Sequence, residues 1–277
     1  MKFIVLSIVL FSALVLNSCA GLRDRESESG PAPTVYSTGW YMGENLSSEY
    51  ITYSKTEIVP LLPEKKENGP TLEFFMDTLD ILEEADGKLL RQTLYGGKTC
   101  QEYVENVYNR VTGDYKKRKD DAADASGAAY NWSYSETFDG AVYPSLLVIS
   151  RRIYNYTGGA NGQNERIFFV LDTKLSSKVA LNDILAEGAE KDIQARIDDD
   201  LRARYRAAPG APLTSAGFLN DTAGVPQNFF ISREGLGFCW NPYEIAPHSM
   251  GTLEVVLPYA QIENLLNDRG REMFKSL

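Results

Sequence analysis

The chain has 277 residues with 38 acidic and 28 basic side chains, so its formal net charge is −10. This charge disfavours nucleic acid and anionic lipid surfaces as partners, because both select clustered Lys and Arg. The single histidine, His248, excludes multi-histidine metal centres and any Ser-His-Asp or Cys-His arrangement built without it. We therefore expect no metal, no cofactor and no nucleic acid.

The N-terminus has the form of a bacterial lipoprotein signal. An apolar run over 3–16 follows Lys2; it is short for a membrane span but suits a signal-peptide core. The sequence Leu-Asn-Ser-Cys that ends it resembles a lipobox, whose cysteine is acylated after cleavage. We expect residues 1–18 to be removed and Cys19 to anchor the protein in a membrane of the bacterial cell envelope. The alternative is an ordinary secretory signal with an incidental cysteine.

The rest of the chain divides by composition. Residues 19–44 are charged and then rich in Gly, Pro and Ser, which is typical of a tether. We expect an N-terminal α+β subdomain over 45–125 and a C-terminal domain over 126–277. With Cys19 lipidated, Cys100 and Cys239 remain in an oxidising compartment, so they either form a disulfide or stay as two separate buried thiols.

In the N-terminal subdomain, strands are predicted at 50–59 and 72–82, which are rich in Ile, Tyr and Phe. Thr99 and Glu102 then have the spacing of a capping box. Apolar residues recur at helical spacing from there to Tyr115, so an amphipathic helix is predicted.

The C-terminal domain begins with a predicted antiparallel meander. Its strands lie at 130–138, 142–156 and 165–172, and they are joined by an Asp139-Gly140 turn and a glycine-rich turn over 158–164.

Beyond the meander, a second amphipathic helix is predicted from Ile193 to Tyr205. Strands at 228–232, 237–240 and 252–257 and a short helix at 259–266 complete the chain. Because helices are inserted among antiparallel strands, the fold class is α+β, with antiparallel sheets, two main amphipathic helices and a short C-terminal helix.

Two motifs carry a family resemblance. The sequence YTGGANG at 156–162, followed by ALNDIL at 180–185, resembles the Tyr-Thr-Gly-Gly-Ala-His-Gly hairpin and its sequel in the RsiV-like extracellular domain. The segment FCWNPYEIAPHSMGTLEVVLPYAQI at 238–262 is similar to the closing motif of that family. The resemblance covers about 130–266.

That family includes the ectodomain of an anti-sigma factor that binds lysozyme and the N-terminal module of a peptidoglycan deacetylase. The resemblance implies an envelope domain used for recognition, and we expect neither a sigma-binding segment nor a deacetylase domain here. Asn161 stands where the family usually has histidine, and His248 where it often has tyrosine. A role that needs the first imidazole therefore does not carry over, because asparagine cannot titrate.

If the two motifs meet in space, their aromatic and amide side chains form one recognition rim suited to sugar or protein contact. The candidate binding residues are Tyr154, Tyr156, Asn161, Asn164, Tyr243 and Glu244. The alternative is structural: Gly159 and Gly162 permit turn angles closed to other residues, while Asn161 and Asn164 tie the turn to itself.

We predict a non-catalytic surface lipoprotein that binds cell-wall peptidoglycan or a protein such as lysozyme. Two alternatives stay open. A glycan hydrolase would use two carboxylates about 5 to 10 Å apart, taken from Glu165, Asp172 and Glu244. A purely structural envelope protein would use the motif residues for stability alone. The run Asp198-Asp199-Asp200 is interpreted as a solvated helix face, not a metal site.

Overall fold

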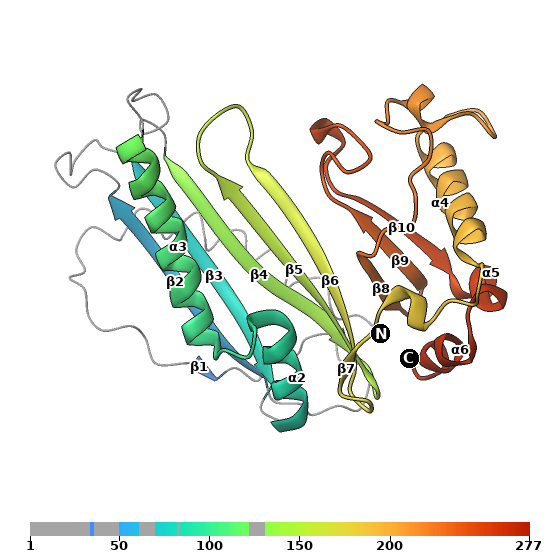
Figure 1. Cartoon of the computed structure of the whole chain (residues 1–277), viewed down its shortest axis with the longest axis horizontal. Coiled ribbons are helices and arrows are strands. Elements are labelled where there is room, and N and C mark those ends of the chain that lie inside the picture. The colour runs from blue at the N-terminus through green and yellow to red at the C-terminus, as the bar shows by residue number, and fades with distance from the viewer. Residues whose placement is uncertain (1–33, 36–49, 61–69, 82–83, 122–130) are drawn as a thin grey trace, which may run out of the picture. The chain divides into compact units, whose positions relative to one another are not determined.

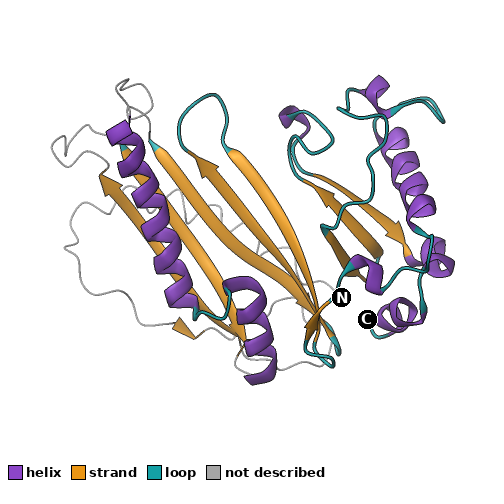
Figure 2. Ribbon diagram, in the orientation of Figure 1, coloured by secondary structure: helices purple, strands orange, loops and turns teal. Residues whose placement is uncertain are grey.

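Two β-sheets and the helices packed on them make up the described part of the chain (Figure 1, Figure 2). The structure is a computed structural model that describes residues 34–35, 50–60, 70–81, 84–121 and 131–277. These residues belong to one unit that starts at Pro33. The arrangement confirms the α+β prediction. The predicted signal peptide and Cys19 lie outside the described residues.

The larger sheet has seven strands in the order β1 to β7. They are β1 (Thr34–Val35), β2 (Tyr50–Pro60), β3 (Thr71–Ile81), β4 (Trp132–Val142), β5 (Leu146–Tyr156), β6 (Gln163–Asp172) and β7 (Ser177–Lys178). All neighbours are antiparallel except β3 and β4, which are parallel. The β3–β4 pairing carries the sheet across the predicted boundary at residue 125, and β1 lies within the predicted tether.

Helices α2 (Glu84–Tyr95) and α3 (Cys100–Asp121) connect the two parallel strands, as a parallel pair requires a long crossover. The predicted capping box of α3 is present: the Thr99 backbone N–H donates to Glu102 Oε2 at 2.9 Å, and the Glu102 N–H donates to Thr99 Oγ1. Sequence periodicity did not predict α2. It is fixed by tertiary contact, since the buried Tyr95 hydroxyl donates to the Leu79 carbonyl at 2.7 Å.

The first core lies between these helices and one face of the larger sheet. On α3 the buried residues recur at helical spacing, namely Val104, Val107, Val111 and Tyr115. They pack with alternate residues of the strands beneath, such as Phe74 of β3. The predicted amphipathic helix is therefore confirmed.

The predicted turn at Asp139-Gly140 is wrong, because β4 continues to Val142. A Cβ on Gly140 would lie 2.3 Å from the Val148 carbonyl oxygen, so this glycine permits the close approach of β5. The chain reverses three residues later, where the Tyr143 N–H donates to the Leu146 carbonyl at 2.8 Å.

The smaller sheet has the antiparallel order β10-β9-β8. Its strands are β8 (Phe229–Ser232), β9 (Gly235–Trp240) and β10 (Leu253–Pro258), and the helices of this region are α4 (Glu190–Arg204), α5 (Tyr259–Ile262) and α6 (Asp268–Lys275). The short helix predicted at 259–266 is confirmed as α5 and the 3-10 turn Glu263–Leu265 that follows it. The sequence pattern did not predict α6, whose N-terminus is capped by Asn267: its Oδ1 accepts the Gly270 N–H at 2.9 Å.

The second core joins the two sheets. It contains residues of α4 and of β8 to β10, together with Val148 of β5 and Val170 of β6. The half of the β5–β6 hairpin near Leu146 and Leu171 is consequently packed on both faces. The other half, which ends in the glycine-rich turn, contributes less to the two cores (Figure 1). No helix in the described ranges is both long and apolar enough to cross a bilayer.

Candidate functional site

The two motifs singled out in the sequence meet at the outer edge of β6. Asn241 Oδ1 accepts the Arg166 backbone N–H at 2.7 Å, and Asn241 Nδ2 donates to the Arg166 carbonyl at 3.2 Å. His248 Nε2 lies 3.1 Å from the Gly162 carbonyl oxygen. The segment 241–248 is therefore held against the β5–β6 hairpin by contacts between side chain and backbone.

A second asparagine completes this edge. Asn228 Oδ1 accepts the Phe168 N–H at 2.8 Å, and its amide nitrogen donates to the Arg166 carbonyl at 2.8 Å. An edge strand presents backbone donors and acceptors that must find partners. Here asparagine side chains supply them, so Asn228 and Asn241 join the two sheets without a continuous strand ladder.

Within the 241–248 segment, Tyr243 is held in an unusual conformation. Its φ is +73°, in the left-handed region that bulky residues rarely adopt, and its side chain is 63% exposed. The Tyr243 N–H donates to the Ala246 carbonyl at 3.0 Å, and the Asn241 N–H donates to Glu244 Oε2 at 2.8 Å. The segment thus fixes its own shape and presents an aromatic ring to solvent, 5.6 Å from the His248 ring.

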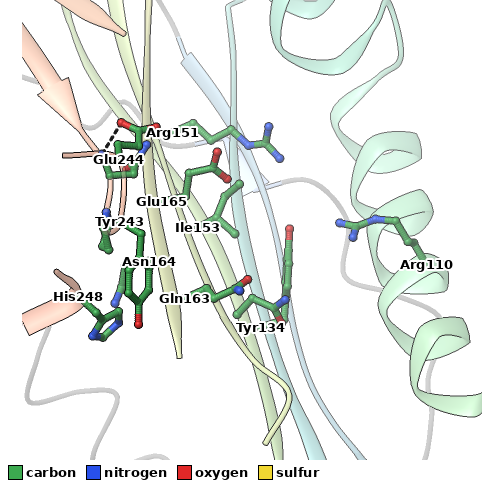
Figure 3. Close-up of a pocket in the computed structure, with 13 residues that line it drawn as sticks. Arg110, Tyr134, Arg151, Ile153, Gln163, Asn164, Glu165, Tyr243, Glu244 and His248 are labelled. Atoms are coloured by element: carbon green, nitrogen blue, oxygen red, sulfur yellow. Dashed lines mark hydrogen bonds between the residues drawn. The ribbon is translucent and has the colours of Figure 1, made fainter. Parts of the chain in front are cut away.

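A groove of about 420 Å³ lies between this segment, the sheet and α3 (Figure 3). Tyr134, Ile153 and Glu165 come from three adjacent strands, and Arg110 reaches the groove from α3. The complete lining is Arg110, Tyr134, Arg151, Ile153, Asn155, Gln163, Asn164, Glu165, Asn241, Pro242, Tyr243, Glu244 and His248. Amides, aromatic rings and charges of both signs therefore share one concave surface.

A buried carboxylate lies beside the floor of the groove. Glu136 has no exposed side-chain surface and accepts three hydrogen bonds, from Arg151 Nε at 2.8 Å, Tyr103 Oη at 2.8 Å and Tyr134 Oη at 2.6 Å. Burial, and then the Glu136 charge, raise the pKa of both phenols well above their ordinary value, so they remain donors. Burial opposes the charge of Arg151, but Glu136 raises its pKa overall.

Sequence reasoning missed Glu136, Arg151 and Arg110. The sequence did contain a signal for Glu136. It lies two residues from the buried Tyr134 and from the buried Phe138, so strand alternation places all three on the core face. A charge at such a position requires a partner. Nothing in the local sequence identified Arg151 or Arg110 as members of the same site.

Two further hollows adjoin the groove. One of about 280 Å³ shares Arg110, Tyr134 and Asn155 with it and continues along α3. The other, of about 570 Å³, shares Asn164 and His248 among its lining residues and contains Tyr154 and Arg166. The 241–248 segment contributes to the groove and to the larger hollow.

The predicted rim residues fall into two groups. Asn164, Tyr243 and Glu244 line the groove, and Tyr154 lines the larger hollow. Tyr156 and Asn161 line neither: Tyr156 donates its hydroxyl to the Gly159 carbonyl at 3.0 Å, and Asn161 is exposed at the hairpin turn.

The glycines of the hairpin turn serve different purposes. Gly158 and Gly159 adopt φ values of +92° and +104°, as a tight turn requires. Gly162 has no such angle; a Cβ there would lie 2.4 Å from Tyr154 Cε2, so it is needed for close contact with that ring. Neither Asn161 nor Asn164 makes a side-chain hydrogen bond within the described ranges, so the predicted amide ties are not seen there.

The three candidate catalytic acids are not gathered together. Glu165 and Glu244 both line the groove, whereas Asp172 accepts the Leu175 N–H at 3.0 Å and pairs with Arg269 at 3.1 Å. Asp172 is buried and lies in the opposite half of β6, so its role is structural.

The acidic run on α4 is only partly a solvated face. Asp199 and Asp200 pair with Arg202 and Arg204 on the same helix. Asp198 is buried and accepts the Ala223 N–H at 2.8 Å, which corrects the prediction for that residue. The described residues contain no group of three or more His, Cys, Asp or Glu arranged to hold a metal ion.

The two cysteines are free and buried, so the disulfide is corrected to the alternative of separate thiols. Cys100 packs in the core beneath α2 and α3, with its Sγ 3.8 Å from the Leu79 carbonyl oxygen. Cys239 lies on β9, with its Sγ 3.9 Å from the Arg166 carbonyl oxygen. Cys100 is the first residue of α3 and belongs to the first core, whereas Cys239 belongs to the smaller sheet, so each thiol is enclosed by its own neighbours.

Comparison with known proteins agrees at the level of the fold. Residues 182–260 match the family described as a protein of unknown function, DUF3298. The RsiV-like fold falls within this family, in line with the resemblance of the two motifs. No curated protein matches the chain.

Two solved structures of DUF3298 proteins are similar. The one from Bacteroides fragilis has 19% identity and a TM-score of 0.69, over 83% of this chain and 97% of its own. The one from Pseudomonas aeruginosa PAO1 has 18% identity and a TM-score of 0.51, over 78% and 94%. At these identities the likeness shows a shared fold.

Proposed function

We propose that this protein is a non-catalytic binding protein of the bacterial envelope and that its groove binds a cell-wall glycan. The observation that carries the proposal is Tyr243, an aromatic side chain that is 63% exposed at the groove although its backbone adopts φ +73°. Such strain persists where the surrounding structure enforces it, and it concentrates at functional sites.

The chemistry around Tyr243 suits sugar rings. An exposed ring offers a flat apolar face, and the amides of Asn155, Gln163 and Asn164 offer donors and acceptors for hydroxyl groups. A groove of about 420 Å³ is in the range of small-ligand sites. We therefore favour a few sugar units over a flat protein epitope.

The acids of the groove support binding over hydrolysis. Glycoside hydrolysis in most families uses a pair of carboxyl groups, one on each side of the scissile bond. Glu244 is engaged in the loop through the Asn241 N–H, and Asp172 lies elsewhere in an ion pair. Of the three candidate acids, Glu165 alone makes no hydrogen bond or ion pair with the residues that the structure describes. One unengaged carboxylate does not make the required pair.

Location in the envelope rests on the N-terminal sequence. An acylated Cys19 would hold the domain at a membrane through the 19–44 segment, and several acyl chains give stable anchoring. Mass spectrometry of the mature N-terminus tests this part of the proposal. An unmodified Cys19 in protein isolated from cells would refute the anchor while leaving the groove to be judged separately.

The binding function is tested by calorimetric titration with peptide-free peptidoglycan strands and, in parallel, with lysozyme. We expect saturable binding to the strands and no release of reducing ends. Binding to lysozyme alone would replace the glycan by a protein partner, and binding to neither would overturn the proposal. Strand cleavage abolished by Glu165→Gln would replace it by the hydrolase.

A further inference from the structure

Two guanidinium groups line the groove on the side of the sheet that faces α3. Arg110 extends from α3 toward the sheet, and Arg151 extends from β5 on the same side of the sheet (Figure 3). Tyr134 lines the groove with them, with its ring centroid 5.9 Å from Arg110 Cζ. In a chain of formal net charge −10, two arginines that line one groove require an explanation.

Arg110 has no carboxylate partner among the residues that the structure describes. It is exposed, and it forms no ion pair within 4.0 Å there. Its neighbour on the groove surface is the face of Tyr134, which leaves the guanidinium edge available. A guanidinium in this situation is suited to a bidentate contact with a carboxylate.

Arg151 is different, because Glu136 neutralises and orients it. The Arg151 Nε donates to Glu136 Oε1 at 2.8 Å, and the side chain is 20% exposed. Its terminal nitrogens make no further hydrogen bond within the described segments. Glu136 therefore fixes Arg151 in position while leaving donors for a ligand, as a positioning group does.

The groove also contains acids. Glu165 comes from β6, where it pairs in register with Ile153, and Glu244 comes from the 241–248 segment. Neither forms an ion pair in the part of the chain described, and Figure 3 shows Glu165 between Glu244 and Arg151. Arg110, which reaches the groove from α3, is therefore the cation that is left to bind an anionic group.

We propose that the groove selects a glycan that carries carboxyl groups, with one carboxylate bound between Arg110 and Arg151 and the sugar ring lying toward Tyr243. This inference rests on the proposed function and names the class of glycan. The hollow of about 280 Å³ continues from Arg110 past Asp114 along α3, so it leaves room for the glycan to extend beyond the bound carboxylate.

The test compares two forms of one probe. Peptide-free peptidoglycan strands carry free lactyl carboxylates, and the same strands with those groups methyl-esterified do not. We expect the wild type to bind the free acid about tenfold more tightly than the ester, the effect of one charge-assisted hydrogen bond. Arg110→Gln should remove this difference, because the free acid should lose about tenfold more affinity than the ester.

Lys117→Gln is the matched control, because Lys117 is exposed on the same helix and lines none of the three hollows. It should leave the preference intact. Equal binding of acid and ester by the wild type, or an equal loss of both in Arg110→Gln, would overturn the carboxylate site and leave glycan binding standing. Failure of the wild type to bind either form would instead defeat the proposed function.

Discussion

The imidazole Nε2 of His248 lies 3.1 Å from the carbonyl oxygen of Gly162, although 86 residues separate them. Together with the contact between Asn241 and Arg166, it joins the 241–248 segment to the β5–β6 hairpin. The groove consequently has walls from distant parts of the chain, held by a small number of hydrogen bonds. Its geometry should be sensitive to changes at those contacts.

His248→Ala removes one of them. Because the contact is partly buried, we expect the free energy of unfolding to fall by about 1 kcal/mol, the usual net value of one hydrogen bond. Glycan affinity should fall as well, since the loop would no longer be tied to Gly162. Urea denaturation and titration measure the two effects. Ser249→Ala, at the exposed neighbouring residue, should change neither stability nor affinity. A His248→Ala variant with wild-type stability and affinity would contradict the proposed role of this contact.

Tyr243→Gly should separate binding from stability. Glycine adopts φ near +73° without strain, so the free energy of unfolding should rise or stay constant, by about 0 to 1 kcal/mol, while glycan affinity drops at least about tenfold. Thermal melts and titration of one preparation test this. Leu219→Gly is the control, because Leu219 is 51% exposed but does not have a positive φ. Glycine relieves no strain there, so the free energy of unfolding should fall. Lost stability with intact binding in Tyr243→Gly would show that Tyr243 only supports the loop.

Gly162→Ala should destabilise the hairpin through the Tyr154 ring. Its Cβ would lie 2.4 Å from Tyr154 Cε2, so the half-buried ring must move aside, and we expect a loss of about 1 kcal/mol, the lower end of the range for overpacking. Gly113→Ala is the opposite control: it lies within α3 with nothing within 4 Å of the added Cβ, and it should stabilise by about 0.5–1 kcal/mol. Denaturant midpoints measure the stability of both variants. A Gly162→Ala variant as stable as the wild type would contradict the close contact with Tyr154.

Glu136→Gln should be among the more damaging single changes on the large sheet. The variant leaves the Arg151 charge without its partner beside the buried Tyr134 and the half-buried Tyr103, and removal of one member of a buried ion pair costs about 3 kcal/mol or more. Tyr103→Phe, which deletes one donor, should cost about 1 kcal/mol. Chemical denaturation gives both values. A Glu136→Gln variant as stable as the wild type would mean that the carboxylate is dispensable.

The buried thiols predict alkaline sensitivity. Burial raises the pKa of Cys100 from its ordinary value of 9.0 to about 11, and that of Cys239 to about 12. Above pH about 9 the unfolded chain releases these protons while the folded chain keeps them, so the free energy of unfolding falls as pH rises toward the folded values. Below pH 9 the thiols contribute no pH dependence.

Denaturation at pH 8 and pH 10 measures this slope, and the Cys100→Ala/Cys239→Ala double variant should have a shallower one. Alkylation at pH 8 should modify both thiols only after unfolding, because buried thiols at these pKa values contain almost no thiolate. Equal slopes for the two proteins, or rapid alkylation of the folded chain, would contradict the burial of the thiols.

The sequence by itself determined the elements whose pattern is local. The capping box at Thr99 and the recurrence from Val104 to Tyr115 depend only on helical geometry, so α3 was predictable, as were most strands of the meander. The Asp139-Gly140 turn was not, because that glycine is selected by the approach of Val148 across the sheet. Likewise, the sequence could identify two motifs as candidates but could not state which of their residues face one another.

Tertiary structure alone decided the membership of the groove. Arg110, Arg151 and Tyr243 come from a helix, a strand and a loop, and no local spacing relates them. It also decided the roles of the predicted binding residues. Tyr156 stabilises the hairpin turn through the Gly159 carbonyl, whereas Asn164 lines the groove. The reason is physical: periodicity records which face of an element is buried, whereas the partner of an Arg, Glu or Asn side chain depends on the register and packing of distant segments.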